Sequence, residues 1–377
     1  MTKIFITIPW FLPAYRAGGP VQSIANLIRE YTNGVEYYIF CGDTDVNGAE
    51  LKDISTRGWT VFNDHTHVWY ATPEKTSETL VKQVAKVKPD ILFIVGMFSW
   101  HYNIVPLLYC KGPRKIISSR GMLHPGALTQ KKWKKKIYLQ IFKLLEYQHK
   151  TDFHATDKQE AKFIGKYFGD LAQIFTASNF PNTIGALPLP KKEVGSLRLA
   201  TIALISPMKN ILSVLMAFET STDLIQYDIY GAVKDENYWD ECKMQIKKLP
   251  ENITVIVHRE IEPAKVKDAL HDAHVFILPS KSENFGHALY EALSAGRPLI
   301  TSHHTPWNCL QSAHAGMNVS MESLTELSAA IHFFAAMDAE TLNQWHCGAI
   351  DYAEKSVDVE KIREDYGMMF GASTSSN

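Results

Sequence analysis

Short apolar runs alternate with longer amphipathic segments along the chain, and the clearest example lies between residues 274 and 301. Residues 274–279 form an apolar run typical of a buried strand, and residues 298–301 form another. Between them, Gly286 leads into a segment of helical length. Strands that alternate with helices form parallel sheets that are covered on both faces. This region therefore predicts a strand–helix–strand unit within a parallel sheet.

The same alternation recurs in both halves of the chain and predicts an α/β protein. A length of 377 residues is enough for two α/β domains of ordinary size. Because ligands bind at the carboxyl ends of parallel strands, we expect two Rossmann-like domains with parallel sheets facing across a cleft. The predicted strands are Lys3–Ile8, Glu36–Cys41, His67–Thr72, Ile91–Val95, Lys115–Ser118, Asp152–Ala155, Gln173–Thr176, Leu197–Ile205, Gln226–Tyr230, Ile253–His258, His274–Leu278 and Leu299–Thr301.

A linker is predicted in the middle of the chain. Residues 177–183 lead into a stretch that contains proline, lysine and glycine and ends at Gly195. A two-domain cleft is expected to close about a hinge, which we place near Asn179–Thr183. The predicted divisions are residues 1–180, residues 181–355, and a C-terminal helix and tail at residues 356–377 that crosses back to the first domain, with its helix at Asp358–Phe370.

Composition excludes several classes of protein. The formal net charge is −1 and 46% of residues are hydrophobic, so no overall field favours nucleic acid. No apolar run approaches the roughly 18 residues that span a bilayer, and Pro9 and Pro13 interrupt the N-terminal segment, unlike a signal peptide. The five cysteines are scattered, as is typical of free thiols in a reducing compartment. We expect a soluble, cytoplasmic protein.

Two carboxylates, with seven residues between them, follow the apolar run at 274–279. Glu283 lies in the predicted loop, where it can accept hydrogen bonds from sugar hydroxyls, and Glu291 lies in the predicted helix, where it can bind a ribose. The helix N-terminus between them suits a diphosphate. His287 and Glu291 are also spaced like half a zinc site, but no third ligand is apparent nearby. We predict a nucleotide-sugar as substrate, with no metal and no cofactor.

Two other loops follow the first predicted strand of each half. Gly18 and Gly19, with Pro20 suited to the first turn of a helix, would let the backbone approach a ligand closely. A tight turn before a helix explains the glycines equally well. Lys209 could neutralise a phosphate at a helix start. The alternative for Lys209 is a solvated surface lysine.

The loop at residues 118–126 brings a cation and an imidazole together. Arg120 and His124 lie in a stretch punctuated by glycines after a predicted strand, and functional loops are often built this way. The alternative is that His124 only caps a neighbouring element.

A basic run opens the next predicted helix. Five lysines and a tryptophan occupy residues 131–136, ahead of apolar positions at Ile137, Ile141, Leu144 and Leu145. Cations are disfavoured at a helix N-terminus, so the run mildly favours binding to anionic lipid at the cytoplasmic face of the inner membrane, or to a diphosphate-lipid acceptor. A solvated helix start is the alternative, and a nucleic-acid role is disfavoured because the patch is single. The residues of the run are Lys131, Lys132, Trp133, Lys134, Lys135 and Lys136.

These motifs together resemble a known family. The segment from Glu283 to Gly286, followed by Glu291–Ile300, resembles the carboxylate signature of retaining GT-B glycosyltransferases of family 4, also called group 1. The stretch Thr305–Asn308 resembles a subgroup from bacterial surface-polysaccharide loci. The resemblance covers nearly the whole chain. Its weaker parts are Gly18–Gly19, Phe98–Trp100, Arg120–Gly121, Gly126–Leu128, and Tyr230–Gly231 with Asp235, Tyr238 and Trp239.

The resemblance implies a hexosyl-type transferase that retains the anomeric configuration. Sugar would pass from a nucleotide-diphosphate-sugar to a glycan or polyprenyl-diphosphate-linked acceptor in lipopolysaccharide, capsule or exopolysaccharide biosynthesis. Electrostatic stabilisation of the leaving diphosphate would replace an enzyme nucleophile and a metal. The implied contacts are Glu283 with the sugar hydroxyls, Phe285, Gly286, His287 and Ala288 with the sugar and diphosphate, Glu291 with the ribose, and Lys209 with the diphosphate, approached by Gly18 and Gly19 from the first domain.

One position departs from the family pattern. Leu204 stands five residues before Lys209, where the family usually has an arginine. The loss of a diphosphate cation would cost about 2–4 kcal/mol of transition-state stabilisation unless another cation replaces it. Arg120 and Arg259 are the candidates for that role. Arg120 itself stands where many relatives carry a histidine, which leaves its acceptor-side role open.

Three other functions stay open at this point. Leu204 is compatible with a catalytically degenerate nucleotide-sugar-binding subunit of a glycan synthase complex. A GT-B-fold sugar-nucleotide epimerase would use the same donor residues. The basic run is compatible with a protein that acts chiefly at a membrane surface.

Overall fold

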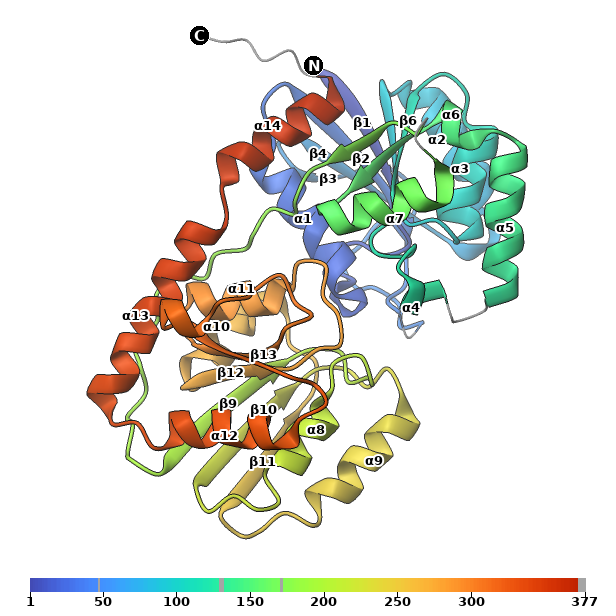
Figure 1. Cartoon of the computed structure of the whole chain (residues 1–377). Helices are drawn as coiled ribbons and strands as arrows, with labels where there is room; N and C mark the ends of the chain where they lie inside the picture. The colour runs from blue at the N-terminus through green and yellow to red at the C-terminus, as the bar shows by residue number, and fades with distance from the viewer. Residues whose placement is uncertain (47, 129–131, 170–171, 372–377) are drawn as a thin grey trace. The chain divides into compact units, whose positions relative to one another are not determined.

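The computed structural model describes residues 1–46, 48–128, 132–169 and 172–371, and the chain divides into two compact α/β units (Figure 1). Unit 1 comprises Met1–Phe180 and Val359–Asn377, and unit 2 comprises Pro181–Asp358. The last helix in the sequence therefore belongs to the unit that contains the N-terminus. Lys131, in the predicted basic run, lies outside the described residues.

Unit 1 is built on an eight-stranded sheet with the order β3-β4-β2-β1-β5-β6-β7-β8. Its strands pair in parallel except for the edge pair β3–β4, which is antiparallel. Strand β3 was not predicted, because Val61 and Phe62 are both exposed and give no alternating pattern. The strands are β1 Thr2–Thr7, β2 Val35–Gly42, β3 Thr60–Asn63, β4 Thr66–Ala71, β5 Ile91–Val95, β6 Arg114–Ser118, β7 Asp152–Ala155 and β8 Ile174–Thr176.

The helices of unit 1 begin and end at recognisable local signals. Pro20 lies in the first turn of α1, where its missing N–H leaves no intrahelical bond unmade. Asp157 caps α7 by accepting hydrogen bonds from the backbone N–H groups of Gln159 and Glu160. The helices are α1 Gly19–Glu30, α2 Thr76–Val87, α3 Val105–Tyr109, α4 Pro125–Leu128, α5 Lys132–Leu144, α6 Tyr147–Lys150, α7 Lys158–Phe168 and α14 Val359–Phe370, with short turns at Tyr15–Ala17, Pro73–Lys75 and Trp100–Ile104.

Unit 2 is built on a six-stranded parallel sheet with the order β11-β10-β9-β12-β13-β14. Strand β9 ends at Ile202, three residues before its predicted end, and Ile205 forms only an isolated bridge with Val233. Strand β14 was not predicted, since glycine and asparagine make up half of it. The strands are β9 Ser196–Ile202, β10 Leu224–Tyr230, β11 Ile253–His258, β12 Val275–Leu278, β13 Leu299–Ser302 and β14 Gly316–Val319.

Helices cover both faces of this second sheet. In β12, Val275 and Ile277 pack in one hydrophobic cluster, whereas Phe276 and Leu278 pack in another. This alternation follows from the two-residue period of a strand, and it makes every residue of β12 buried. The helices are α8 Ile211–Ala217, α9 Glu236–Ile246, α10 Val266–His271, α11 His287–Ser294, α12 Leu324–Ala335 and α13 Ala339–Ser356, with short turns at Pro263–Lys265 and Gln311–Ala313.

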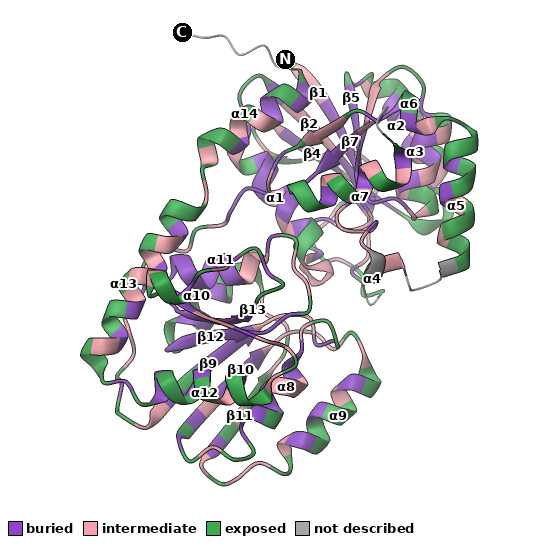
Figure 2. Ribbon diagram, viewed as in Figure 1, coloured by how far each residue is buried: buried purple, intermediate pink, exposed green. Residues whose placement is uncertain are grey.

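Burial follows these layers in each unit (Figure 2). The central strands are buried, and the helices alternate between buried and exposed positions. The prediction of a two-domain α/β fold with parallel sheets is confirmed, apart from the antiparallel edge strand of unit 1.

Candidate functional site

Three neighbouring strands at the centre of the unit 2 sheet deliver the candidate donor-site residues. β9, β12 and β13 lie side by side in the sheet, and all three run in the same direction. Their carboxyl-end loops contain Lys209, Glu283 and Trp307, respectively. The carboxyl edge of a parallel sheet is where α/β domains bind ligands, so these loops form the candidate site of unit 2.

Lys209 and Glu283 form an ion pair. The Lys209 Nζ atom lies 2.5 Å from Glu283 Oε1, although 74 residues separate the two in sequence. The side chains are 22% and 12% exposed, so both are shielded and neither is fully enclosed. A lysine ammonium has three donors, and one bond to Glu283 leaves two for a phosphate. The structure thus brings together two of the four residues predicted to be catalytic.

Hydrogen bonds to backbone carbonyls hold the Glu283 loop against its neighbours. Lys281 N donates to Met208 O at 2.8 Å, which joins the loop to the one that carries Lys209. Trp307 Nε1 donates to Phe285 O at 2.7 Å, and the two rings meet edge to face. Both Phe285 and Trp307 are buried. These contacts support the backbone of the loop that carries Glu283.

Gly286 is the N-cap of α11, and its conformation requires glycine. Its φ of 74° lies in the left-handed region, and an added Cβ would come within 2.9 Å of Leu289 Cδ1. No side chain caps the helix, and no acidic residue lies in its first turn. The positive end of the α11 dipole is therefore not neutralised by the helix itself, and this arrangement suits an anion. His287 and Ala288, the first two residues of α11, are partly exposed at this end.

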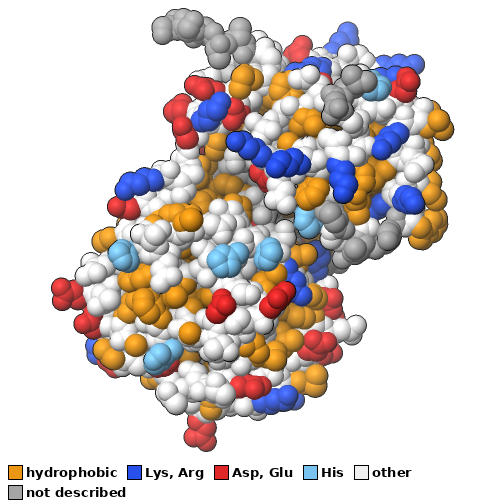
Figure 3. Space-filling view, in the orientation of Figure 1, with side chains coloured by type: hydrophobic (Ala, Val, Ile, Leu, Met, Phe, Trp, Pro, Cys, Tyr) orange, Lys and Arg blue, Asp and Glu red, His pale blue; other side chains and the backbone are white. Residues whose placement is uncertain are grey.

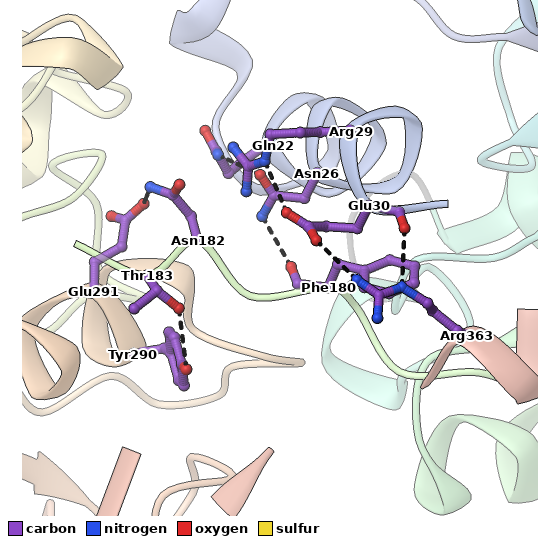
Figure 4. Close-up of polar contacts among 10 residues, drawn as sticks. All are labelled: Gln22, Asn26, Arg29, Glu30, Phe180, Asn182, Thr183, Tyr290, Glu291 and Arg363. Atoms are coloured by element: carbon purple, nitrogen blue, oxygen red, sulfur yellow. Dashed lines mark hydrogen bonds and ion pairs between the residues drawn. The ribbon is translucent and has the colours of Figure 1, made fainter. Parts of the chain in front are cut away.

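Glu291 lies further along α11 and contacts the segment that enters unit 2. Asn182 Nδ2 donates to Glu291 Oε1 at 2.8 Å, and the hydroxyls of Thr183 and Tyr290 lie 3.4 Å apart (Figure 4). Glu291 is only 7% exposed. Asn182 was not predicted as a site residue, because its contact with Glu291 spans 109 residues.

The preceding residues of that segment are held within unit 1. Asn26 of α1 donates from Nδ2 to Phe180 O at 2.8 Å, and Arg363 of α14 forms an ion pair with Glu30 at 3.4 Å (Figure 4). Within the predicted hinge at 179–183, Phe180 is therefore hydrogen-bonded within unit 1, and Asn182 is hydrogen-bonded within unit 2.

Gly18 and Gly19 open α1 in unit 1. Gly18 is the N-cap, with a φ of 72° that favours glycine. Gly19 is different, because a Cβ added to it would meet no described atom within 4 Å beyond its chain neighbours and the backbone of its own helix. Pro20 gives a local reason for this glycine, because the proline ring disfavours a helical conformation for a preceding residue that has a Cβ.

Arg120 lies in the loop after β6, at a φ of 49°. Its Nη1 atom donates to Asn179 Oδ1, while Nε and Nη2 are buried without a hydrogen-bond partner among the described residues. Burial, with the Arg120 charge as the second cause, lowers the pKa of His154 to about 3. The Arg120 guanidinium is therefore held inside unit 1 and is not a solvated surface group.

Glu160 of α7 forms hydrogen bonds with the same loop. Its carboxylate accepts hydrogen bonds from Ser119 Oγ at 2.6 Å, Gly121 N at 2.5 Å, and both Thr156 N and Oγ1. Burial by itself would raise the pKa of Glu160, but these four bonds outweigh it and lower the pKa. The loop therefore has a fixed shape that the sequence did not reveal.

His124 caps the following helix turn. Its Nδ1 atom accepts a hydrogen bond from Gly126 N at 3.1 Å, and its ring packs edge to face on Phe163. This contact matches the structural alternative given above, while a part in catalysis stays a prediction.

Arg259 and Leu204 lie apart from the ion pair. Arg259 is exposed and follows β11, the edge strand of the sheet. No contact in the described part of the chain joins it to Lys209 or Glu283. Leu204 lies between the end of β9 and Lys209, and its carbonyl accepts a hydrogen bond from Ser206 Oγ at 3.4 Å. Neither residue supplies a second cation beside Lys209 in this structure.

Residues 190–345 match the family described as glycosyl transferases group 1. The match lies within unit 2 and contains the whole Lys209–Glu283–Glu291 arrangement. This part of unit 2 is therefore similar to glycosyl transferases group 1 domains. The chain matches no curated protein sequence.

Solved structures resemble the whole chain and show that its fold is GT-B. Sucrose-phosphate synthase from Thermosynechococcus elongatus has a TM-score of 0.72 at 15% identity, covering 98% of each chain. Anabaena HepE in complex with UDP-glucose has a TM-score of 0.72 at 14% identity, covering 99% of this chain and 100% of that one. WaaG, a glycosyltransferase involved in lipopolysaccharide biosynthesis, has a TM-score of 0.65 at 11% identity, covering 98% and 100%.

Two motif residues of the sequence analysis have structural roles. Asp235 caps α9 by accepting a hydrogen bond from Tyr238 N, and the Tyr238 hydroxyl accepts one from Leu212 N. A pocket of about 380 Å³ lies beside them and is also lined by Lys281, which the sequence analysis did not single out. Lys281 lies two residues before Glu283, and this proximity was the signal in the sequence that could have marked it as a candidate site residue.

Within the described ranges, no group of three or more His, Cys, Asp or Glu side chains is placed to hold a metal ion. No helix in the described part of the chain has the length and apolar character needed to cross a membrane.

Proposed function

We propose that the chain is a retaining glycosyltransferase that moves a hexose-type sugar from a nucleotide-diphosphate-sugar to a glycan or lipid-linked acceptor. The observation that carries this proposal is the Lys209–Glu283 ion pair beside the uncapped start of α11. The family match of residues 190–345 and the GT-B fold support it.

The donor would bind along the Glu283 loop and α11. Its diphosphate would take the remaining donors of Lys209 and the first-turn N–H groups of α11, since both favour an anion. Glu283, still held by Lys209, would accept hydrogen bonds from the sugar hydroxyls. Glu291 would bind the ribose, and Asn182, its present partner at 2.8 Å, would either share that site or move aside.

The leaving diphosphate would be stabilised electrostatically. Charge grows on its oxygen as the glycosidic bond breaks, and a preorganised lysine and helix dipole stabilise that charge. The departing oxygen would accept the proton of the acceptor on the same face, which retains the configuration. We propose that this scheme needs no metal and no cofactor, so activity is expected to persist in the presence of a chelator.

A role in surface polysaccharide synthesis is part of the proposal. WaaG is a glycosyltransferase involved in lipopolysaccharide biosynthesis, and it shares this fold. HepE was crystallised with UDP-glucose, which supports trying UDP-sugars first. We expect the reaction to take place in the cytoplasm, with the capsule, exopolysaccharide or lipopolysaccharide acceptor supplied on a lipid carrier.

The experiment is a transfer assay with radiolabelled UDP-sugars and a mixture of lipid-linked acceptors, using the wild type and Glu283→Ala. The account expects wild-type transfer, a loss of about 10²–10³-fold in the variant, and product of unchanged anomeric configuration by NMR. A circular dichroism spectrum and a thermal transition like those of the wild type would show that the variant folds. Wild-type turnover in Glu283→Ala would refute the assignment.

Leu204 supports one competing function, a nucleotide-sugar-binding subunit without transferase activity. The missing cation removes part of the stabilisation that the leaving diphosphate needs. Measurable nucleotide binding, together with no transfer from any donor, would favour that function. An epimerase of the same fold would be separated from both by conversion of the donor without any acceptor.

A further inference from the structure

Helix α5 of unit 1 has two apolar faces. Its inner face is buried, because Leu139 and Phe142 pack in the core of unit 1 and Tyr138 packs edge to face on Phe98. Helices of a globular domain normally bury one apolar stripe and turn polar residues outward. In α5 the outward side is also apolar, and the inner packing gives no reason for that.

The outer stripe consists of large side chains in contact range along the helix. Trp133, Ile137, Ile141 and Leu144 follow one another at spacings of four, four and three residues, which places them on one face. They are 65%, 51%, 49% and 82% exposed. No other helix in the described residues exposes as many large apolar side chains, and scattered single ones are ordinary.

Lysines border this stripe. Lys134 lies on one side of it, and Lys136 and Lys143 lie on the other, as the helical repeat of 3.6 residues requires. All three are exposed, and no carboxylate in the described part of the chain forms an ion pair with them. Figure 3 shows hydrophobic and basic side chains together over α5, at the right-hand edge of the view.

We infer that the outer face of α5 docks on an anionic lipid surface. An amphipathic helix binds there by inserting its apolar face while lysines contact the acidic headgroups. Tryptophan is favoured at that depth because its ring is apolar and its N–H is polar. The inference rests on the α5 surface alone and holds whether or not the chain transfers sugars.

The lysine border argues against the other occupants. The cores of protein interfaces are depleted in lysine. A second copy of the chain docked through the same face would bring like charges together. An anionic surface is complementary to the border, and the stripe needs an apolar partner next to it. A lipid headgroup and acyl boundary provides both.

The experiment is co-sedimentation of the purified full-length chain with vesicles. Phosphatidylcholine vesicles are compared with mixed phosphatidylcholine and phosphatidylglycerol vesicles. One variant changes Ile137, Ile141 and Leu144 to Ser, and another changes Lys134, Lys136 and Lys143 to Glu. The matched control changes Lys158, Lys162 and Lys166 to Glu, because these exposed lysines on α7 of the same unit give an identical change in net charge.

We expect the wild type and the α7 variant to bind mixed vesicles and not neutral ones. Both α5 variants are expected to bind at least about tenfold more weakly. Vesicles should also shift the fluorescence of the wild type to the blue, by an increment that Trp133→Phe removes. Circular dichroism checks that each variant folds.

Several results would overturn the inference. Unchanged vesicle binding by either α5 variant would remove α5 as the contact. Equal loss in the α7 variant would mean that only net charge matters. A wild type that ignores vesicles but forms a dimer, with the dimer lost in the serine variant, would assign the stripe to a second copy of the chain.

Discussion

The loop after β6 in unit 1 and the loop after β12 in unit 2 both follow the carboxyl end of a parallel strand, but the two loops use their charged groups differently. In unit 1, Glu160 accepts four hydrogen bonds from residues on or beside the loop and is 4% exposed. In unit 2, Glu283 is 12% exposed and bonds to a lysine that is itself 22% exposed. A buried carboxylate whose hydrogen bonds all go to its own chain holds a loop in one conformation. A carboxylate that is paired with a partly exposed lysine can instead exchange that partner for a ligand.

The difference predicts which loop carries chemistry and which carries stability. The first test concerns Lys209. Lys209→Ala is expected to lower turnover by about 10²–10³-fold, because it removes the cation closest to the proposed leaving group. Its unfolding free energy is expected to change by less than about 1 kcal/mol, since the pair is partly open to solvent. Lys267→Ala, an exposed lysine on α10, is the control and should leave both quantities unchanged.

The second test reverses the comparison in unit 1. Glu160→Gln replaces an ion that accepts four hydrogen bonds with an amide that must donate toward some of the same groups. We expect unit 1 to lose about 2–4 kcal/mol of unfolding free energy in urea titrations. Nucleotide binding at unit 2 should persist under native conditions. A variant as stable as the wild type would mean that the Glu160 network is dispensable.

Two glycines sharpen the comparison further. Gly286→Ala forces a φ near 74° on an alanine and brings its Cβ within 2.9 Å of Leu289, so we expect a loss of about 1–2 kcal/mol. Gly19→Ala meets no described atom within 4 Å beyond its chain neighbours, but Pro20 disfavours a helical alanine before it, so we expect a loss of stability smaller than that of Gly286→Ala. Reduced turnover in a folded Gly19→Ala would support close approach of the donor. Thermal melts and initial rates measure the two effects separately.

The last test concerns a pH dependence that both units share. Burial lowers the pKa of His154 in unit 1 to about 3 and that of His274 in unit 2 to about 4. The Ala177 carbonyl can only accept, so Nε2 of His154 donates to it and Nδ1 accepts from the Ser118 hydroxyl. Both histidines are therefore neutral in the folded chain. In the unfolded chain a histidine has a pKa of about 6.5, so below that pH the unfolded chain binds more protons than the folded one.

The sign of the effect follows from this proton balance. The stability that each neutral histidine contributes is complete above pH 6.5 and is lost as the pH falls toward the folded pKa. We expect a decrease of about 1 kcal/mol per histidine between pH 6.5 and 5.5. Urea titrations at several pH values measure it, and His154→Asn should weaken the slope of unit 1 alone. A slope of opposite sign would contradict the buried neutral state.

Local patterns in the sequence predicted most of the fold. The strands of both sheets came from β-branched and aromatic runs, and the Glu283–Gly286–Glu291 segment was correctly assigned to a loop that leads into a helix. Strands β3 and β14 were missed, because exposed apolar residues in one and Gly and Asn in the other hide the strand pattern.

The supporting contacts of the site could not be predicted in the same way. Asn182 with Glu291, Trp307 with Phe285, and Glu160 with the loop after β6 each join residues that are distant in sequence. Such pairs depend on how the elements pack, and no local periodicity encodes them. The spacing of apolar residues in the sequence shows that α5 has an apolar stripe. Only the exposure of those residues in the structure distinguishes a stripe that faces outward from one that faces the core.

The most direct test of the account is calorimetry of nucleotide-diphosphates and nucleotide-sugars, without added metal, on the wild type, Glu291→Ala and Glu160→Gln. The account predicts that one nucleotide and its sugar bind the wild type and Glu160→Gln alike and bind Glu291→Ala at least about tenfold more weakly. Equal binding by Glu291→Ala, or no binding of any nucleotide by the wild type, would contradict a donor site on the β12 loop and α11.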